Sequence, residues 1–146
     1  MDFSSLLHVH LVSTLLMVGI IWFVQIVHYP LMVQVGSLQF HEYARLHQLR
    51  TTFVVSGPML LEIGTAILLF SWYPALRSSW SFLAAAVLLV IIWASTIFWQ
   101  APLHRALLAG YDERRIRLLV STNWPRTLAW SLRAILIGEL LWPITV

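Results

Sequence analysis

Four long apolar runs alternate with polar connectors along this chain. The runs cover residues 6–29, 52–73, 80–99 and 128–146. A helix needs about 20 residues to cross the hydrocarbon core of a bilayer. Lipid also requires every backbone group to be paired within its own segment, so segments of this length must be helices and not strands. The pattern therefore predicts one all-α membrane domain with four transmembrane helices.

Local signals place the ends of the first two helices. Pro30 disfavours helical geometry in the residue before it, so we expect the first helix to end or kink there. Ser37 is a suitable N-cap for a second helix that begins near residue 38. That helix is expected to reach about residue 72, with a bend at Gly57-Pro58.

The second connector carries its own signals. We expect the third helix to continue past Pro102 and to end at Gly110, a favourable C-terminal glycine. Asp112 then caps a short arginine-rich helix in the headgroup layer. Pro125 suits the first turn of a separate fourth helix, where its missing N–H has no cost.

Composition agrees with a membrane environment. Hydrophobic residues make up 60% of the chain and charged residues 10%, whereas soluble domains carry about 25% charged residues. The absence of cysteine excludes disulfides and thiolate metal sites. The net charge is only +3, and the arginines lie between apolar runs without forming a basic domain, so no nucleic-acid partner is expected.

Arginine placement predicts the orientation. Cytoplasmic loops of membrane proteins are enriched in basic residues, so the two long connectors are expected in the cytoplasm and both termini outside. We expect a multi-pass protein of a bacterial inner membrane. Arg133 is the exception, because it lies inside the fourth run and must snorkel or find a partner in the bundle. The connector arginines are Arg45, Arg50, Arg105, Arg114, Arg115, Arg117 and Arg126.

The polar connectors read as two copies of one pattern, offset by 75 to 77 residues. Two units, about 5–73 and 80–146, would share one orientation and be related by a pseudo-two-fold axis along the membrane normal. The expected architecture is an antiparallel four-helix bundle with both polar connectors on one side. The matched pairs are Gln25 and Gln100, His28 and His104, His47 and Asn123, Arg50 and Arg126, Thr51 and Thr127, and Glu62 and Glu139.

Helical spacing gathers these polar residues into a candidate ligand site. His47, Arg50 and Thr51 are separated by three and four positions, so they share one helix face. Glu62 lies about 16 Å deeper on the same helix. An ionisable group at that depth costs at least about 2.5 kcal/mol unless it is protonated, paired or lining a cavity. The expected site residues are Gln25, His28, His47, Arg50, Glu62, Gln100, His104, Asn123 and Arg126.

Three interpretations of this site stay open. The first is a metal or haem centre in which His28, His47 and His104, with a nearby glutamate, bind iron, copper or a haem. The second is a pocket for a quinone-like or anionic small molecule, held by Arg50 and Arg126. The third is a structural role, in which polar side chains at helix ends satisfy one another. The contacts expected for that role pair Arg50 with Glu42 and Arg126 with Asn123.

The chain also resembles a known group of proteins. Small bacterial four-helix membrane proteins of unknown function share the WFVQxVHYP segment at 22–30, the HxxRT step at 47–51 and the NWxRT step at 123–127. A weaker similarity links the chain to the anthrone-oxygenase-like membrane proteins. That resemblance implies oxidation of an aromatic substrate to a quinone, but it transfers no catalytic residue.

These observations favour a small membrane oxidoreductase or oxygenase-like protein acting on a quinone-like or aromatic substrate. The alternatives are a protein that binds or transports a small molecule or lipid, and a structural membrane subunit; a homo-oligomer fits each of them. A transporter needs access from the outer side, where His8, His10 and Glu139 are expected. Otherwise His8 and His10 are expected to be simply interfacial.

Overall fold

The computed structural model describes residues 2–141, and this part of the chain is helical with no strand. Residue 1 and residues 142–146 lie outside the described part, and with them the last residues of the expected fourth run. The elements are α1 (Phe3–Phe23), η1 (Val24–His28), α2 (Tyr29–Leu31), η2 (Met32–Gln34), α3 (Phe40–Trp72), η3 (Pro74–Ser78), α4 (Trp80–Ser95), η4 (Thr96–Gln100), α5 (Ala101–Leu107) and α6 (Glu113–Glu139).

Within the described residues, three helical stretches are long and apolar enough to cross a membrane. They are Phe3–Gln34, Phe40–Trp72 and Trp80–Leu107. Their outward faces carry large apolar side chains, of which Phe53 is 84% exposed and Phe98 72%. Exposed apolar surface on this scale marks contact with lipid or with another protein. The chain therefore has the helices of a multi-pass membrane protein.

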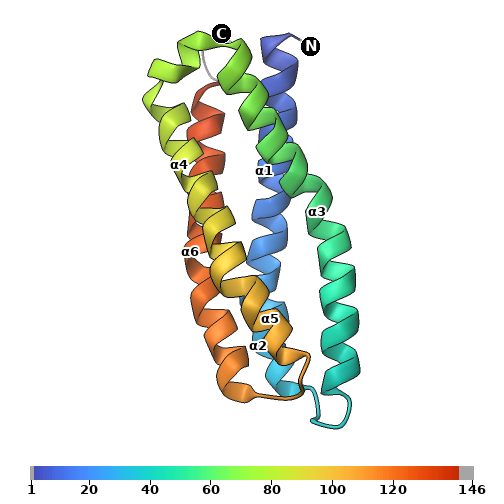
Figure 1. Ribbon diagram of the computed structural model, residues 1–146. Coiled ribbons are helices and arrows are strands. Elements are labelled where there is room, and N and C mark those ends of the chain that lie inside the picture. The colour runs from blue at the N-terminus through green and yellow to red at the C-terminus, as the bar shows by residue number, and fades with distance from the viewer. Residues whose placement is uncertain (1, 142–146) are drawn as a thin grey trace.

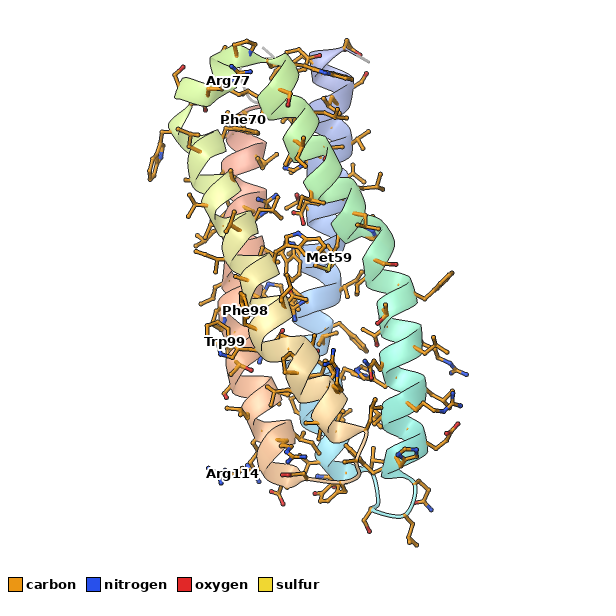
Figure 2. The ribbon with its side chains drawn as sticks, viewed as in Figure 1. Met59, Phe70, Arg77, Phe98, Trp99 and Arg114 are labelled. Atoms are coloured by element: carbon orange, nitrogen blue, oxygen red, sulfur yellow. The ribbon has the colours of Figure 1, made fainter. Side chains whose placement is uncertain are left out.

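The long helices lie side by side (Figure 1). Helix α1 packs against both α3 and α6, and α6 packs against both α1 and α4. The start of α1, the η3 turn and the end of α6 lie at one end of the molecule, while the turns that follow η2 and α5 lie at the other. Side chains reflect this division, because Arg77 and Arg114 stand at opposite ends (Figure 2).

Local chemistry explains where several helices begin. The carboxylate of Asp2 accepts a hydrogen bond from the Ser5 N–H and caps α1, and this bond holds the pKa of Asp2 below its usual range. Asp112 caps α6 in the same way, as its sequence position predicts. Gly110 has a φ of +135°, which only glycine adopts without strain, so it forms the turn between α5 and α6.

Two π-helical segments interrupt the first and third spans, and both precede a proline. Segment η1 ends two residues before Pro30, and η4 ends two residues before Pro102. Proline has no N–H and crowds the carbonyl one turn back, and the wider π turn relieves that crowding. The helix therefore passes through Pro30, so of the two expected alternatives, an end or a kink, the end does not occur.

Two other predicted helix ends are also wrong. Ser37 does not cap α3, which begins at Phe40 after Gln39. Helix α6 is continuous from Glu113 to Glu139, so Pro125 lies inside it and no separate arginine-rich helix exists. One consequence is that the polar connector residues around 123–127 are held on a long, rigid helix.

Candidate functional site

A cavity of about 150 Å³ lies between α1, α3, α6 and the η4–α5 segment. Its apolar wall comes mainly from α1 and α3, and Met59 projects from α3 towards the neighbouring helices (Figure 2). Its polar wall collects side chains from α2, α3, α6 and the η4–α5 segment. The polar lining residues are Tyr29, His47, Gln48, Thr51, Thr52, Thr96, Gln100, His104 and Arg126.

Three of these lining side chains have a buried polar atom without a hydrogen-bond partner in the described residues. They are Nε2 of His47, Oε1 of Gln100 and Nε of Arg126. The three side chains are only 7%, 2% and 7% exposed. Leaving a buried polar group unpaired costs about 1–3 kcal/mol, and such groups are rare in folded proteins. Their convergence on one cavity makes this cavity the candidate site for a polar ligand.

The hydrogen bonds of the lining side chains determine which of their polar atoms face the cavity. The Thr122 hydroxyl donates to the Leu118 carbonyl at 2.7 Å, so it can only accept from Gln100. Gln100 therefore uses its amide nitrogen for Thr122, at 3.0 Å, and keeps its oxygen free. The cavity thus offers one acceptor from Gln100, one N–H donor from Arg126, and an imidazole nitrogen of His47 that can serve either role.

A chain of amide groups holds Arg126 in place. Nη1 of Arg126 donates to Oδ1 of Asn123 at 2.9 Å, and Nδ2 of Asn123 donates to Oε1 of Gln25 at 2.9 Å. Gln25 in turn donates to the Val120 carbonyl at 3.1 Å. The Arg126–Asn123 contact expected from the sequence is formed. Gln25 and Asn123 thus lie behind the cavity and position the arginine.

No acidic side chain neutralises Arg126. Within residues 2–141, no carboxylate lies within the 4.0 Å ion-pair limit of its guanidinium. Its guanidinium also interacts with the neutral hydroxyl of Tyr29 and with the ring of Trp130, whose centroid lies 5.1 Å from Cζ. Burial of an unpaired cation is costly, so the site favours an anionic or strongly polarised ligand.

The histidines of the site form two hydrogen-bonded groups. Nε2 of His28 lies 2.7 Å from Nδ1 of His47, and Thr51 and Tyr43 bond to these same two nitrogens. His104 is held separately, with its Nε2 2.8 Å from the Tyr29 hydroxyl. Each imidazole thus has a fixed orientation at the cavity wall or directly behind it.

This geometry gives no support to the metal interpretation. Within the described residues, no three His, Asp or Glu side chains come together in a way that could hold a metal ion. The 2.7 Å between His28 and His47 is a hydrogen-bond distance, because two nitrogens on one metal stand about 2.0–2.1 Å from the ion and further apart from each other. We therefore assign no three-histidine iron or copper site to His28, His47 and His104.

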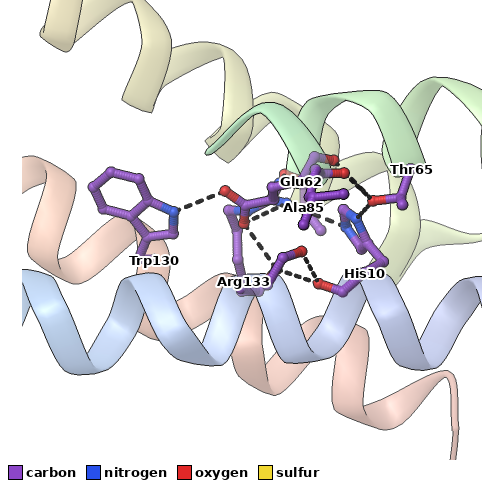
Figure 3. A network of polar contacts seen from close by, with 9 residues as sticks. His10, Glu62, Thr65, Ala85, Trp130 and Arg133 are labelled. Carbon is purple, nitrogen blue, oxygen red and sulfur yellow. Dashed lines mark hydrogen bonds and ion pairs between the residues drawn. The ribbon is translucent and has the colours of Figure 1, made fainter. Parts of the chain in front are cut away.

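A second polar cluster lies deeper in the molecule and is a fully buried ion pair (Figure 3). Nη2 of Arg133 lies 3.0 Å from Oε1 of Glu62, and the side chains are 1% and 0% exposed. Thr14 donates to the same carboxylate at 2.8 Å, and Nε1 of Trp130 donates at 3.0 Å. Arg133 also donates to the Ala85 carbonyl. The cluster therefore joins α1, α3, α4 and α6.

His10 belongs to this deep cluster. Its Nδ1 lies 2.7 Å from the Thr65 hydroxyl, its Nε2 lies 3.3 Å from Arg133, and its side chain is only 1% exposed. The expectation that His10 is simply interfacial is therefore wrong. Trp130 connects the two clusters, since its ring faces Arg126 and its N–H bonds to Glu62.

The nine predicted site residues thus separate into four groups. His47, Gln100, His104 and Arg126 line the cavity, and Gln25 and Asn123 support Arg126. His28 and Arg50 line a neighbouring groove between α1 and α3. Glu62 lies apart, in the ion pair.

Two acidic side chains outside the cavity also have surroundings that differ from those expected. Arg50 does not bond to Glu42, which pairs with Arg45 at 2.7 Å. Glu139 is exposed and accepts from Ser81 at 3.0 Å, so its surroundings differ from those of Glu62, its expected match.

Sequence reasoning missed several residues of the site. Tyr29 lines the cavity and orients His104, and its place directly before Pro30 was the available signal. Met59 supplies part of the apolar wall, but nothing in the sequence distinguishes it from a core residue.

Comparisons with protein-family models, curated proteins and solved structures gave no match to this chain.

Proposed function

We propose that this chain is an integral membrane protein that binds a quinone-like or phenolic small molecule inside its helices. The observation that carries the proposal is Arg126, a buried cation that lines a cavity and has no carboxylate partner in the described residues. A hydroxyquinone is an anion at neutral pH, and its charged oxygen would accept from Arg126. Hydrogen bonds to charged groups contribute about 1.5–3 kcal/mol.

The size and polarity of the cavity support the same ligand class. A cavity of about 150 Å³ in another protein accepts benzene, so a volume of about 150 Å³ here suits a single ring. A ring hydroxyl that keeps its proton would donate to Oε1 of Gln100, and the neighbouring ionised ring oxygen would accept from Arg126. A ligand carrying both groups would satisfy the atoms that the described residues leave unpaired.

The proposed setting is an antiparallel four-helix bundle in a bacterial inner membrane, formed by a single domain over 1–146. The connector arginines favour a cytoplasmic position for the cavity end of the bundle and an outer position for both termini. The two π segments, each placed before a proline, support a relationship between the halves. Kinship with the anthrone-oxygenase-like proteins is part of this proposal.

A binding titration tests the proposal. Detergent-purified protein is titrated with a tailless dihydroxybenzoquinone, and saturable binding is expected. Arg126→Gln should weaken binding by about 10- to 100-fold, the value of one or two charged hydrogen bonds. Arg45→Gln is the matched control, because Arg45 is exposed and bonds only to Glu42. The absence of saturable binding, or an equal loss in the control variant, would refute the proposal.

A second candidate function is reduction of the bound quinone to a hydroquinone. This reaction takes up two electrons and two protons, and a reduced flavin or nicotinamide is the class of electron donor required. The favouring observation is the His28–His47 pair, because His47 lines the cavity while its Nδ1 contacts Nε2 of His28. Such a pair can relay protons from the groove to the ring.

Reduction would be followed by anaerobic bleaching of the bound quinone in the presence of the reduced donor. His47→Phe should lower the rate of bleaching by a larger factor than it changes the dissociation constant of the quinone. If bleaching does not exceed the rate without protein, the protein is a binding protein and not a reductase.

A further inference from the structure

We infer that the ligand of the cavity carries an apolar tail, which leaves the protein sideways between α1 and α3 and enters the lipid. The inference rests on the proposed function, because it extends the ring-binding site to an amphiphile. It begins from a groove of about 430 Å³ between α1 and α3, which is distinct from the cavity.

The groove is continuous with the cavity wall. Four residues line both spaces: Ile20 from α1, Val24 from η1, and Thr51 and Val55 from α3. A larger groove of about 540 Å³ between α3 and α4 shares no lining residue with the cavity. A ring in the cavity therefore has its shortest lateral exit between α1 and α3.

The lining of the groove matches an apolar chain. Its deeper part is formed by Gly19, Phe23 and Val54, and the last two are 58% and 54% exposed on the outside of the bundle. His28 and Arg50 lie at the end nearer the connectors. A tail that starts at the ring would thus run away from the charged end and along apolar side chains into the hydrocarbon region.

Gly19 keeps the groove open. A Cβ atom added at Gly19 would meet no atom within 4 Å beyond its chain neighbours and the nearby backbone of its own helix, so the space beside this helix is open. A leucine at this position would fill groove volume without a clash at Cβ. Gly64, on the neighbouring helix α3, has equally open surroundings and lines neither the groove nor the cavity, and so it provides a matched control.

Photo-crosslinking tests the inference in protein reconstituted into lipid nanodiscs. The probe is a dihydroxybenzoquinone with an undecyl tail that ends in a diazirine, and adducts are mapped by mass spectrometry. We expect adducts on the peptides that contain Phe23 and Val54, and excess tailless dihydroxybenzoquinone should suppress them. Gly19→Leu should remove most of these adducts, by about tenfold, whereas Gly64→Leu should retain them.

Three results would overturn the inference. One is suppressible adducts on α4 at Trp93 or on η4 at Phe98, which would place the tail in the other groove. The second is adduct formation that Gly19→Leu leaves unchanged. The third is adducts that the tailless ring does not suppress, which would show ordinary lipid-like labelling.

The tailless ring separates this inference from the proposed function. If the tailless ring binds and depends on Arg126 while the tail labels elsewhere, only the tail inference fails. If the tailless ring does not bind at all, both fail.

Discussion

Arg133 and Glu62 form an ion pair of 3.0 Å between α6 and α3, and both side chains are excluded from solvent. Removing one member of such a pair leaves an uncompensated buried charge, which costs about 3–5 kcal/mol. We expect Glu62→Gln to lower the free energy of unfolding by about that amount. Equilibrium unfolding in mixed detergent micelles would measure it.

The double variant Glu62→Gln with Arg133→Met provides the control, because it removes both charges. It should recover most of the stability lost in Glu62→Gln, since no unpaired charge remains buried. The amide oxygen at position 62 can still accept from Trp130, while Thr14 can donate to the His10 carbonyl and accept from the amide NH2. A double variant as unstable as the single one would show that the ion pair is not the source of the loss.

Arg126 should behave in the opposite way to Arg133, although both are buried on α6 seven residues apart. Arg126 has no carboxylate partner in the described residues, so replacing it removes a cost of charge burial. In ligand-free protein, we expect Arg126→Met to unfold within about 1 kcal/mol of the wild type or above it, whereas Arg133→Met should lose about 3–5 kcal/mol. A large loss in Arg126→Met would indicate a structural role for the cation.

The long helices were predictable because their extent depends on the lengths of apolar runs. The sequence also required Arg133 to snorkel or to find a partner, and it has one. The partner itself was not predictable, since it depends on which helices are neighbours and how each is rotated. His10 was misread for the same reason, because its partner Thr65 lies on another helix.

The sequence could not show how closely matched residues of the two halves would correspond in position. The matched polar pairs have offsets of 75 to 77 residues, whereas the first residues of the π segments, Val24 and Thr96, are 72 positions apart. Gln25 is therefore the second residue of its π segment and Gln100 the last. A π turn rotates every later side chain around the helix axis, and the spacing of apolar residues in the sequence does not indicate where such a turn occurs. Gln25 accordingly meets Asn123, while Gln100 faces the cavity.

The hydrogen bond between His28 and His47 predicts a metal-free protein. We expect detergent-purified protein to show no Soret band and no stoichiometric iron or copper, because the two nitrogens already bond to each other at 2.7 Å. Absorption spectroscopy and elemental analysis would measure this. Stoichiometric metal that disappears in a triple alanine variant of His28, His47 and His104 would restore the metal interpretation.

Gly110 should be sensitive to a single added methyl group. Its φ of +135° lies in a region that residues with a Cβ adopt only under strain. We expect Gly110→Ala to lower the free energy of unfolding by about 1–2 kcal/mol. Gly57→Ala is the control, because a Cβ there meets nothing within 4 Å and the residue lies inside a helix, where alanine is favoured. Equal effects of the two variants would contradict the turn assignment.

Met59 should determine which ring size the cavity accepts. It contributes to the apolar wall of the cavity and is 5% exposed, so its side chain is confined. The wild type should bind a one-ring hydroxyquinone and exclude a two-ring hydroxynaphthoquinone, because the cavity measures about 150 Å³. Met59→Ala should enlarge the cavity and shift the preference towards two rings by about tenfold, or ~1.4 kcal/mol.

Competition between the two quinones would measure this shift in preference. Truncation of a buried methionine also costs about 2–5 kcal/mol of stability, so binding is compared below the unfolding transition of the variant. Leu69→Ala is the matched control, because Leu69 is a fully buried residue of the same helix that does not line the cavity. Leu69→Ala should lose stability without a change in preference. A change of preference in both variants would mean that general loosening of the bundle, and not the shape of the cavity, admits the larger ring.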